Sequence, residues 1–255
     1  MRGATVNDVA KKAEPVPKGA TPPGWGEDEL TKFWDNARAN QLGTFANKRG
    51  AYERLAQIDR AFVTAFNGWT NPDSELVAML FLRCHSAFRA AAGLAAAGQA
   101  VECYALDRAL LEFAGYGLHI FRNPSDGTVW LNRHQDEKST EAAKAAFSHR
   151  KVLASVAAAN RDAGKRFELL YQRAIDFGAH PNQLSVTGNM SIVDQPDRRE
   201  MRSIYLHEDG LALNMALKMT ATCGVCALEL AQCVYNARFE LLGVNAAMPY
   251  LKCGL

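Results

Sequence analysis

The sequence contains no long uninterrupted apolar run. Its longest apolar stretches, residues 87–98 and 219–228, are interrupted by Arg89 or bounded by Lys218 and Glu229. Each is shorter than the roughly 18 residues that a membrane span requires. The first residues also lack the continuous apolar segment of a signal peptide. We therefore expect a soluble protein of the cytoplasm that makes no use of a membrane.

An excess of charge of either sign is missing as well. The chain has 29 Lys and Arg against 27 Asp and Glu, which gives a formal net charge of +2. No overall electrostatic field therefore favours nucleic acid or an anionic surface, and such a partner has to be recognised by local residues. The 255 residues are 48% hydrophobic and 22% charged, a composition typical of a globular protein with a sizeable core.

The motifs of several well-known catalytic and metal sites are absent. The sequence has no Ser-His-Asp signature, no glycine-rich phosphate loop, no HExxH and no paired ExxH ligands, so it predicts neither a cofactor nor a metal. Six cysteines without a regular framework are typical of a reducing compartment.

One cysteine pair has the spacing of a redox or zinc half-site. Cys223 and Cys226 form a CxxC, but no second pair follows it. At ~100° per residue, both thiols and Cys233 fall on one helical stripe with Met215 and Met219. We predict that these thiols are reduced and buried in the core, with a redox or metal role as the alternative.

Proline is scarce beyond the first 26 residues, which hold four of the nine prolines and which we interpret as a flexible tail. Because an internal proline removes a helix hydrogen bond, the long spans between the others are where helices can form. The helices predicted in these spans cover residues 27–40, 44–67, 73–97, 99–121, about 140–177 with a possible break near Gly164, and 209–242.

One region does not fit a helical pattern. Residues 184–187, 190–192 and 204–206 favour short strands around a tight turn at Gly188-Asn189. The predicted fold class is therefore all-α, a single helical-bundle domain over residues 27–255 that carries a small β-hairpin excursion around residues 183–207.

The fourth predicted helix carries a candidate polar site. Arg108, Glu112 and His119 share one stripe of this helix, opposite an apolar stripe that includes Leu110. Such a stripe is either the solvated face of an amphipathic helix or, if the helix is covered on both sides, part of a binding pocket whose charges need partners.

A second polar group ends the long fifth segment. It comprises Tyr171, Arg173, Asp176 and His180. Asp176 and His180 are four residues apart, so they face the same way if helical geometry persists to His180, and the carboxylate then orients or charges the imidazole. The alternative is that Gly178 ends the helix first. Arg173 and His180 also match the residue types with which a ribonuclease acts on the phosphate and the 2′-hydroxyl.

These two segments carry a family resemblance. Two stretches resemble a pattern of prokaryotic helical proteins related to the AbiV and HEPN-like bundles. The first is Ala97-Gly98-Gln99 followed by Leu106-Asp107-Arg108-Ala109-Leu110-Leu111-Glu112. The second is Tyr171 followed by Asp176-Phe177-Gly178-Ala179-His180-Pro181. The resemblance covers about residues 75–182.

It implies an all-helical bundle, a homodimer and, in the nuclease members, metal-independent RNA cleavage by an Arg and a His on one helix, here Arg173 and His180. The chain departs from the pattern at Ala174, where nuclease members usually have a polar residue.

Three functions therefore remain open. The first is a non-catalytic binding, sensing or partner-interaction protein. The second is a HEPN-like ribonuclease that uses Arg173 and His180. The third is a bundle that binds a metal or a small ligand in a polar pocket. The residues of that pocket would be Arg108, Glu112, His119, Tyr171, Asp176 and His180. The third function requires these side chains to converge.

Overall fold

The computed structural model describes residues 21–254, which form two compact units, residues 21–36 and residues 37–254. Residues 1–20 of the predicted tail lie outside the described part. In the small unit the rings of Trp25 and Trp34 pack with 5.7 Å between their centroids, and the indole N–H of Trp25 donates to Asp35 at 2.9 Å. Helix α1 (Glu29–Asn47) begins in this unit and continues into the larger one.

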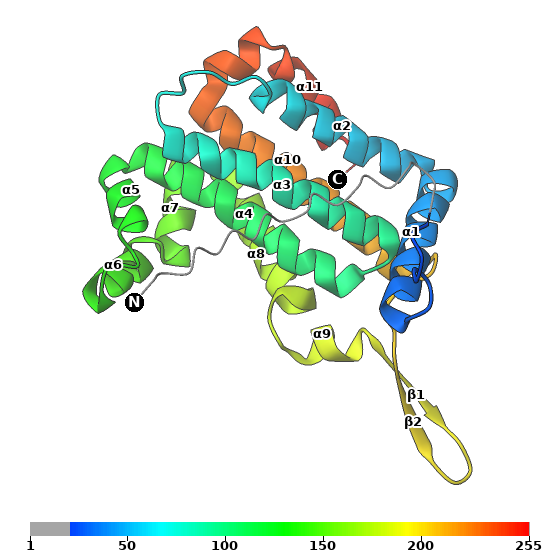
Figure 1. Ribbon diagram of the computed structural model, residues 1–255. Helices are drawn as coiled ribbons and strands as arrows, with labels where there is room; N and C mark the ends of the chain where they lie inside the picture. Colours follow the sequence, from blue (N-terminus) through cyan, green and yellow to red (C-terminus); the bar gives the residue numbers. More distant parts are fainter. Residues whose placement is uncertain (1–20, 255) are drawn as a thin grey trace, which may run out of the picture. The chain divides into compact units, whose positions relative to one another are not determined.

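The centre of the larger unit is a hairpin of two helices, α3 (Glu75–Ala97) and α4 (Ala100–Arg122) (Figure 1). The Ser74 side chain caps the start of α3. Gly98 ends it at φ +84°, in the left-handed region that only glycine enters at little cost. The long helix α10 (Leu211–Leu241) packs against both helices of the hairpin.

Two further helices complete this core. α2 (Arg49–Phe66) packs on α10 and α3, and α11 (Val244–Lys252) packs on α10 and α2. The fully buried side chains that fill the space between these helices include Phe62, Phe81, Phe88, Phe239, Leu217 and Leu228. Removing this apolar area from water is the main stabilising contribution to the bundle.

Four shorter helices follow α4 in the chain. They are α5 (Pro124–Leu131), α6 (Glu137–Ala146), α7 (His149–Ala159) and α8 (Arg161–Ala174). α5 and α6 pack on each other, while α7 and α8 form a second hairpin that packs on α4. The segment predicted over residues 140–177 is broken, but at Asn160 and not at Gly164: α7 ends at Ala159, the Asn160 side chain caps α8, and Gly164 lies buried inside that helix.

The chain then leaves the bundle. A π-helical turn, η1 (Ile175–Ala179), packs on α4 and is followed by α9 (Gln183–Thr187). The predicted strand at residues 184–187 is wrong, because a capping box between Asn182 and Ser185 starts a helix there.

A two-stranded antiparallel sheet follows. β1 (Met190–Asp194) pairs with β2 (Arg199–Ser203), with Ile192 opposite Met201. The turn therefore lies between Asp194 and Arg199 and not at Gly188-Asn189, and the expected strand at residues 204–206 is absent from the sheet. The predicted all-α bundle with a small β-hairpin is confirmed.

α10 is long and apolar enough to cross a membrane by length and composition alone, and no other helix of residues 21–254 passes this test. Its best 18-residue window has a mean hydropathy of 1.5. The prediction that no span is present is based on uninterrupted apolar runs, whereas this average tolerates a single charged residue such as Lys218. A core helix passes the same test, and 67% of the window is buried inside the protein.

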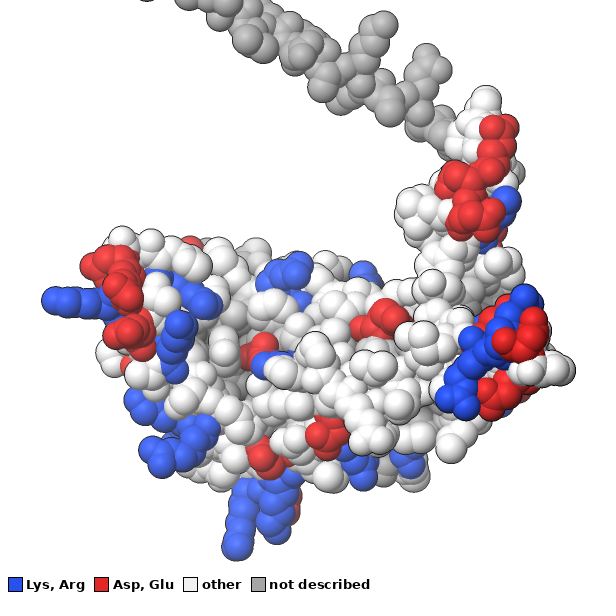
Figure 2. All heavy atoms as spheres, turned by 90° about the horizontal axis from the view of Figure 1, so that it is seen from below, with Lys and Arg blue, Asp and Glu red and all other residues white. Residues whose placement is uncertain are grey.

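The surface charge matches the balanced composition. Figure 2 shows that, on the face seen from below, Lys and Arg side chains form separate groups with acidic side chains among them. On this face they do not merge into the continuous basic stripe that binds a nucleic-acid backbone.

Two carboxyl groups of the bundle have opposite environments. Asp107 on α4 is fully buried, and only its Oδ2 has a partner in the described chain, the Thr220 hydroxyl on α10 at 3.1 Å. Burial therefore raises the pKa of Asp107 well above its usual value. Partial burial acts the same way on Asp59, but hydrogen bonds from Arg89 and His85 outweigh it and lower the pKa of Asp59.

Candidate functional site

The polar residues predicted on α4 and α8 partly converge. Arg108 Nε donates to Glu112 Oε1 at 2.9 Å, and the Tyr171 hydroxyl donates to the same oxygen at 3.0 Å. The Arg108 guanidinium also lies 5.3 Å from the centroid of the Tyr171 ring. Burial and the neighbouring Glu112 raise the pKa of Tyr171 to about 12, so the phenol stays neutral and keeps donating.

His149 belongs to the same network. Its ring stacks on Tyr171 with 4.2 Å between centroids, and its Nε2 bonds to Glu168. His149 is not one of the candidate residues predicted from the sequence. The cavity beside this network has about 30 Å³, which is room for a water molecule but not for a ligand. The network therefore joins α4 to α8 and offers little free binding capacity.

His119 lies elsewhere. Its ring is buried, with Nδ1 2.8 Å from the Ser155 hydroxyl on α7 and Nε2 3.0 Å from Asp126 Oδ2 on α5. Within residues 21–254 it shares no hydrogen bond with Arg108 or Glu112. The three residues occupy one stripe of α4, but different helices pack on that stripe along its length. Glu112 bonds to α8, whereas His119 bonds to α5 and α7.

The expected pairing of Asp176 with His180 does not form. It depends on helical geometry as far as His180, but η1 ends at Ala179 and His180 is extended, with φ −148° and ψ 140°. Asp176 Oδ1 instead accepts a hydrogen bond from Gln172 at 2.9 Å. The His180 ring is exposed, and its Nδ1 lies 3.3 Å from the carbonyl of Pro181.

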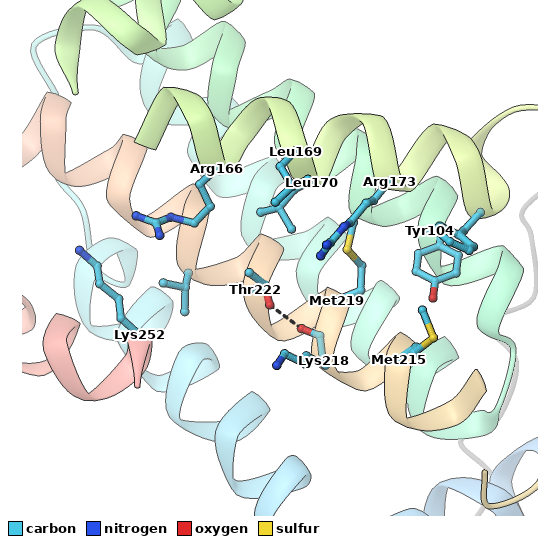
Figure 3. Close-up of a pocket in the computed structure, with 12 residues that line it drawn as sticks. Tyr104, Arg166, Leu169, Leu170, Arg173, Met215, Lys218, Met219, Thr222 and Lys252 are labelled. Carbon is cyan, nitrogen blue, oxygen red and sulfur yellow. Dashed lines mark hydrogen bonds between the residues drawn. The ribbon is translucent and has the colours of Figure 1, made fainter. Parts of the chain in front are cut away.

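Arg173 points into a cleft between α8 and α10, which we call the α8–α10 cleft (Figure 3). The cleft has a volume of about 470 Å³, within the range of small-molecule sites. The residues that line it are Tyr104, Arg166, Leu169, Leu170, Arg173, Phe177, Met215, Lys218, Met219, Thr222, Val225 and Lys252. His180 is not among them, so the two residues of the predicted ribonuclease pair have different surroundings.

The four cations of the cleft are not equally neutralised. Arg166 binds Glu229 through two hydrogen bonds of 2.8 and 3.0 Å, and Lys252 Nζ lies 2.7 Å from the same carboxylate. Arg173 and Lys218 have no acidic partner in the described residues. Their two positive charges are therefore available to an anion that enters the cleft.

The wall between these charges is apolar. Leu170, Met219 and Val225 are buried beneath it, while Leu169 and Met215 are 51% and 40% exposed at its edge. Exposed leucine and methionine side chains lie here beside cations without acidic partners. Such a surface suits a molecule with an apolar body and an anionic head.

The lining residues include no histidine, cysteine or carboxylate. Tyr104 is the one phenol among them, and burial raises its pKa further above the neutral range. The side-chain types that most often transfer protons near pH 7 are therefore not among the lining residues.

The cleft residues other than Arg173 are missed by sequence reasoning. Arg166, Lys218 and Lys252 are of types that usually lie on a solvated surface. A signal is nevertheless present on α8, where Arg166 and Arg173 are seven residues apart with Leu169 and Leu170 between them. This spacing places all four on one face of a helix.

The CxxC pair lies in the core and not in the cleft. Cys223 and Cys226 are fully buried, as are Cys84 and Cys103. Burial raises the pKa of each of these thiols. The prediction of buried thiols is confirmed for the CxxC pair, whereas Cys233 is half-buried and Cys253 is exposed. Within residues 21–254, no group of three or more His, Cys, Asp and Glu side chains is arranged to hold a metal ion.

We expect a thiol reagent to modify the native protein first at Cys253. Its thiol is exposed, while the four core thiols are buried and stay protonated. Mass spectrometry after a short pulse of reagent should find one rapidly labelled site, and the core cysteines should react only in denaturant. Rapid native labelling of Cys223 or Cys226 would contradict the burial described.

Comparisons of the chain with protein-family models, with curated proteins and with solved structures found no match. The fold and the cleft define its class, an all-α bundle with an open cationic and apolar cleft.

Proposed function

We propose that this chain is a non-catalytic binding protein whose α8–α10 cleft takes a small amphipathic anion, a carboxylate on an apolar body. The observation that carries this proposal is the presence of two cations without acidic partners, Arg173 and Lys218, beside an apolar wall. The carboxylate binds these two side chains, and the apolar body covers Leu169, Met215 and Met219.

The balance of charges supports a single anionic head. Glu229 already neutralises the Arg166 end of the cleft, so a second anionic group would meet a carboxylate there. The Arg173 and Lys218 end has no such counter-charge. A ligand therefore gains most when its head lies at this end and its apolar body extends along the wall.

The length of the apolar body should set the affinity. Burying one methylene group contributes about 0.8 kcal/mol, which corresponds to about fourfold in the dissociation constant. Calorimetric titration with straight-chain carboxylates from hexanoate to decanoate should therefore show binding that tightens by up to about fourfold per methylene until the cleft is filled. Matched primary alcohols should bind much more weakly, because they leave both cations without a counter-charge.

Substitutions in the cleft should show how much the anionic head group of the ligand contributes to binding. Arg173→Gln and Lys218→Gln should each weaken decanoate binding by about tenfold, the value of one charge-assisted hydrogen bond, with an unchanged melting temperature. Lys165→Gln is the matched control, because Lys165 lies on the same helix, is exposed and pairs with Asp162 outside the cleft. Equal binding of the alcohols, or equal losses in Arg173→Gln and the control, would refute the proposal.

A further inference from the structure

A second, smaller pocket lies between α4, α5 and α6, and we call it the α4–α6 pocket. It has a volume of about 200 Å³. The residues that line it are Tyr116, Trp130, Arg133, Ala143, Lys144 and Phe147. None of these residues lines the α8–α10 cleft.

Two residues that line this pocket carry hydrogen-bond donors without an acceptor among residues 21–254. Trp130 Nε1 and Arg133 Nε are both buried, and neither has a partner in the described part of the chain. A buried N–H without an acceptor costs free energy, and most buried donors in folded proteins are paired. Trp130 and Arg133 both line the pocket, so an acceptor group that enters it meets two side chains whose buried N–H groups need a partner.

The pocket is also cationic. Arg133 and Lys144 form no ion pair with any described carboxylate. The charge of Arg133 acts on Tyr116, which lines the same pocket. Burial and Glu112 raise the pKa of Tyr116, whereas the positive charge of Arg133 lowers it. Glu112 itself is held by Arg108 and Tyr171, so it does not neutralise Arg133.

Aromatic rings form the remaining walls. Tyr116 and Phe147 lie 4.9 Å apart between ring centroids at an interplanar angle of 60°, and the Trp130 indole completes the lining. Rings beside an indole N–H, a guanidinium group and an ammonium group favour a flat, negatively charged group over a hydrated inorganic ion. Figure 2 shows basic and acidic side chains close together at the α5 and α6 end of the unit, so the positive charge of the pocket comes from Arg133 and Lys144 and not from a wider basic surface.

We propose that the α4–α6 pocket binds a small aromatic oxyanion. Its anionic oxygens accept hydrogen bonds from Trp130 Nε1 and Arg133 Nε and pair with the Lys144 ammonium group. Its ring lies against Tyr116 and Phe147. The shared chemistry covers aromatic carboxylates and aromatic phosphate esters, which the experiment distinguishes.

The experiment follows the indole N–H signals of the full chain by NMR during titration with benzoate. The chain has four tryptophans, and Trp130→Phe assigns the Trp130 signal. We expect a saturable shift of this signal while that of Trp69 stays in place, because Trp69 lies outside this pocket. Phenyl phosphate is titrated in the same way, and the tighter of the two identifies the preferred head group.

Variants test the assigned contacts. Arg133→Gln should weaken benzoate binding by about tenfold or more, and Lys144→Gln by less, because Lys144 is exposed. Lys138→Gln is the matched control on α6, since Lys138 is exposed and does not line the pocket. Arg173→Gln should leave the Trp130 shift unchanged, which separates this pocket from the α8–α10 cleft.

Three outcomes would overturn the inference. The first is a Trp130 signal that does not shift saturably, which would mean that the two donors are satisfied by water alone. The second is equal binding of benzamide, which would remove the role of the charge. The third is equal binding of acetate, which would remove the role of the ring.

Discussion

Replacing Asp107 by Asn is expected to stabilise the protein at neutral pH and to remove a decline in stability with rising pH. In the native protein Asp107 is buried with one oxygen unpaired, and burial raises its pKa well above the usual value. In the unfolded chain the same carboxyl ionises near pH 4. Above that pH the native state binds one more proton than the unfolded state, so the free energy of unfolding falls as pH rises.

The slope has a definite size. For each pH unit over which the native carboxyl stays protonated and the unfolded one is ionised, stability falls by about 1.4 kcal/mol. Asn has nearly the size of Asp and can still accept the hydrogen bond from Thr220, but it cannot ionise. It leaves a buried NH2 group unpaired, which costs about 1–3 kcal/mol, so we expect a net gain that grows with pH once the decline of the wild type exceeds this cost. Urea unfolding of both proteins from pH 4 to pH 8 measures the difference.

Asp59→Asn is the matched control with the opposite sign. The pKa of Asp59 is lowered, so its contribution is present above the unfolded pKa and is lost as the pH falls through the folded pKa. This variant should be less stable than the wild type at pH 7 and should approach it in acid. If Asp107→Asn keeps the wild-type slope above pH 4, the buried carboxyl is ionised in the native state and our assignment is wrong.

Gly98→Ala is expected to destabilise the protein by about 2–5 kcal/mol. Gly98 has φ +84°, which costs an alanine about 1–2 kcal/mol. A Cβ at this position would also lie 2.2 Å from the carbonyl oxygen of His207, and such overpacking adds about 1–3 kcal/mol. His207 cannot withdraw freely, because its N–H donates to the Gly98 carbonyl at 2.8 Å and its ring bonds to Asn189.

Two glycine substitutions separate these contributions. Gly243 has φ +71°, but a Cβ added there would have no neighbouring atom within 4 Å, so Gly243→Ala should cost only the backbone strain. Gly50 is the second residue of α2 and lies in open space at an ordinary helical φ, so Gly50→Ala should not destabilise the protein and should gain at most about 0.5–1 kcal/mol. Thermal unfolding ranks the three variants, and a loss in Gly98→Ala no larger than that in Gly243→Ala would exclude the contact with His207.

The long helices can be predicted from the sequence because local signals agree with the fold. α3 begins after Ser74 and ends at Gly98, and both are signals of the local chain. α5 and α11 escape prediction, because each contains a proline. Pro124 occupies the first turn of α5, where its missing N–H costs nothing, and Pro249 lies within a short helix that packs on α10 and α2. At α9 the strand propensity of Val186 and Thr187 is overridden by the capping box of Asn182.

The candidate site is less predictable for a different reason. Spacing along one helix brings Arg108 to Glu112, but only the packing of α8 on α4 decides that Tyr171 joins them. The α8–α10 cleft draws Arg173 and Lys218 from helices that are far apart in the chain. No local pattern shows that two such cations lack a carboxylate, because this depends on where Glu229 lies after folding.

The position of the α8–α10 cleft in the chain bears on the order of folding. The α3–α4 and α7–α8 hairpins join neighbours in sequence and close short loops, which favours their early formation. α10 lies near the end of the chain and must dock on α2, α3, α4 and α8, so one wall of the cleft is missing until this long-range step is complete. The ligand that we propose for the cleft would therefore recognise only the fully assembled bundle, and by mass action it would draw partly folded chains toward that state.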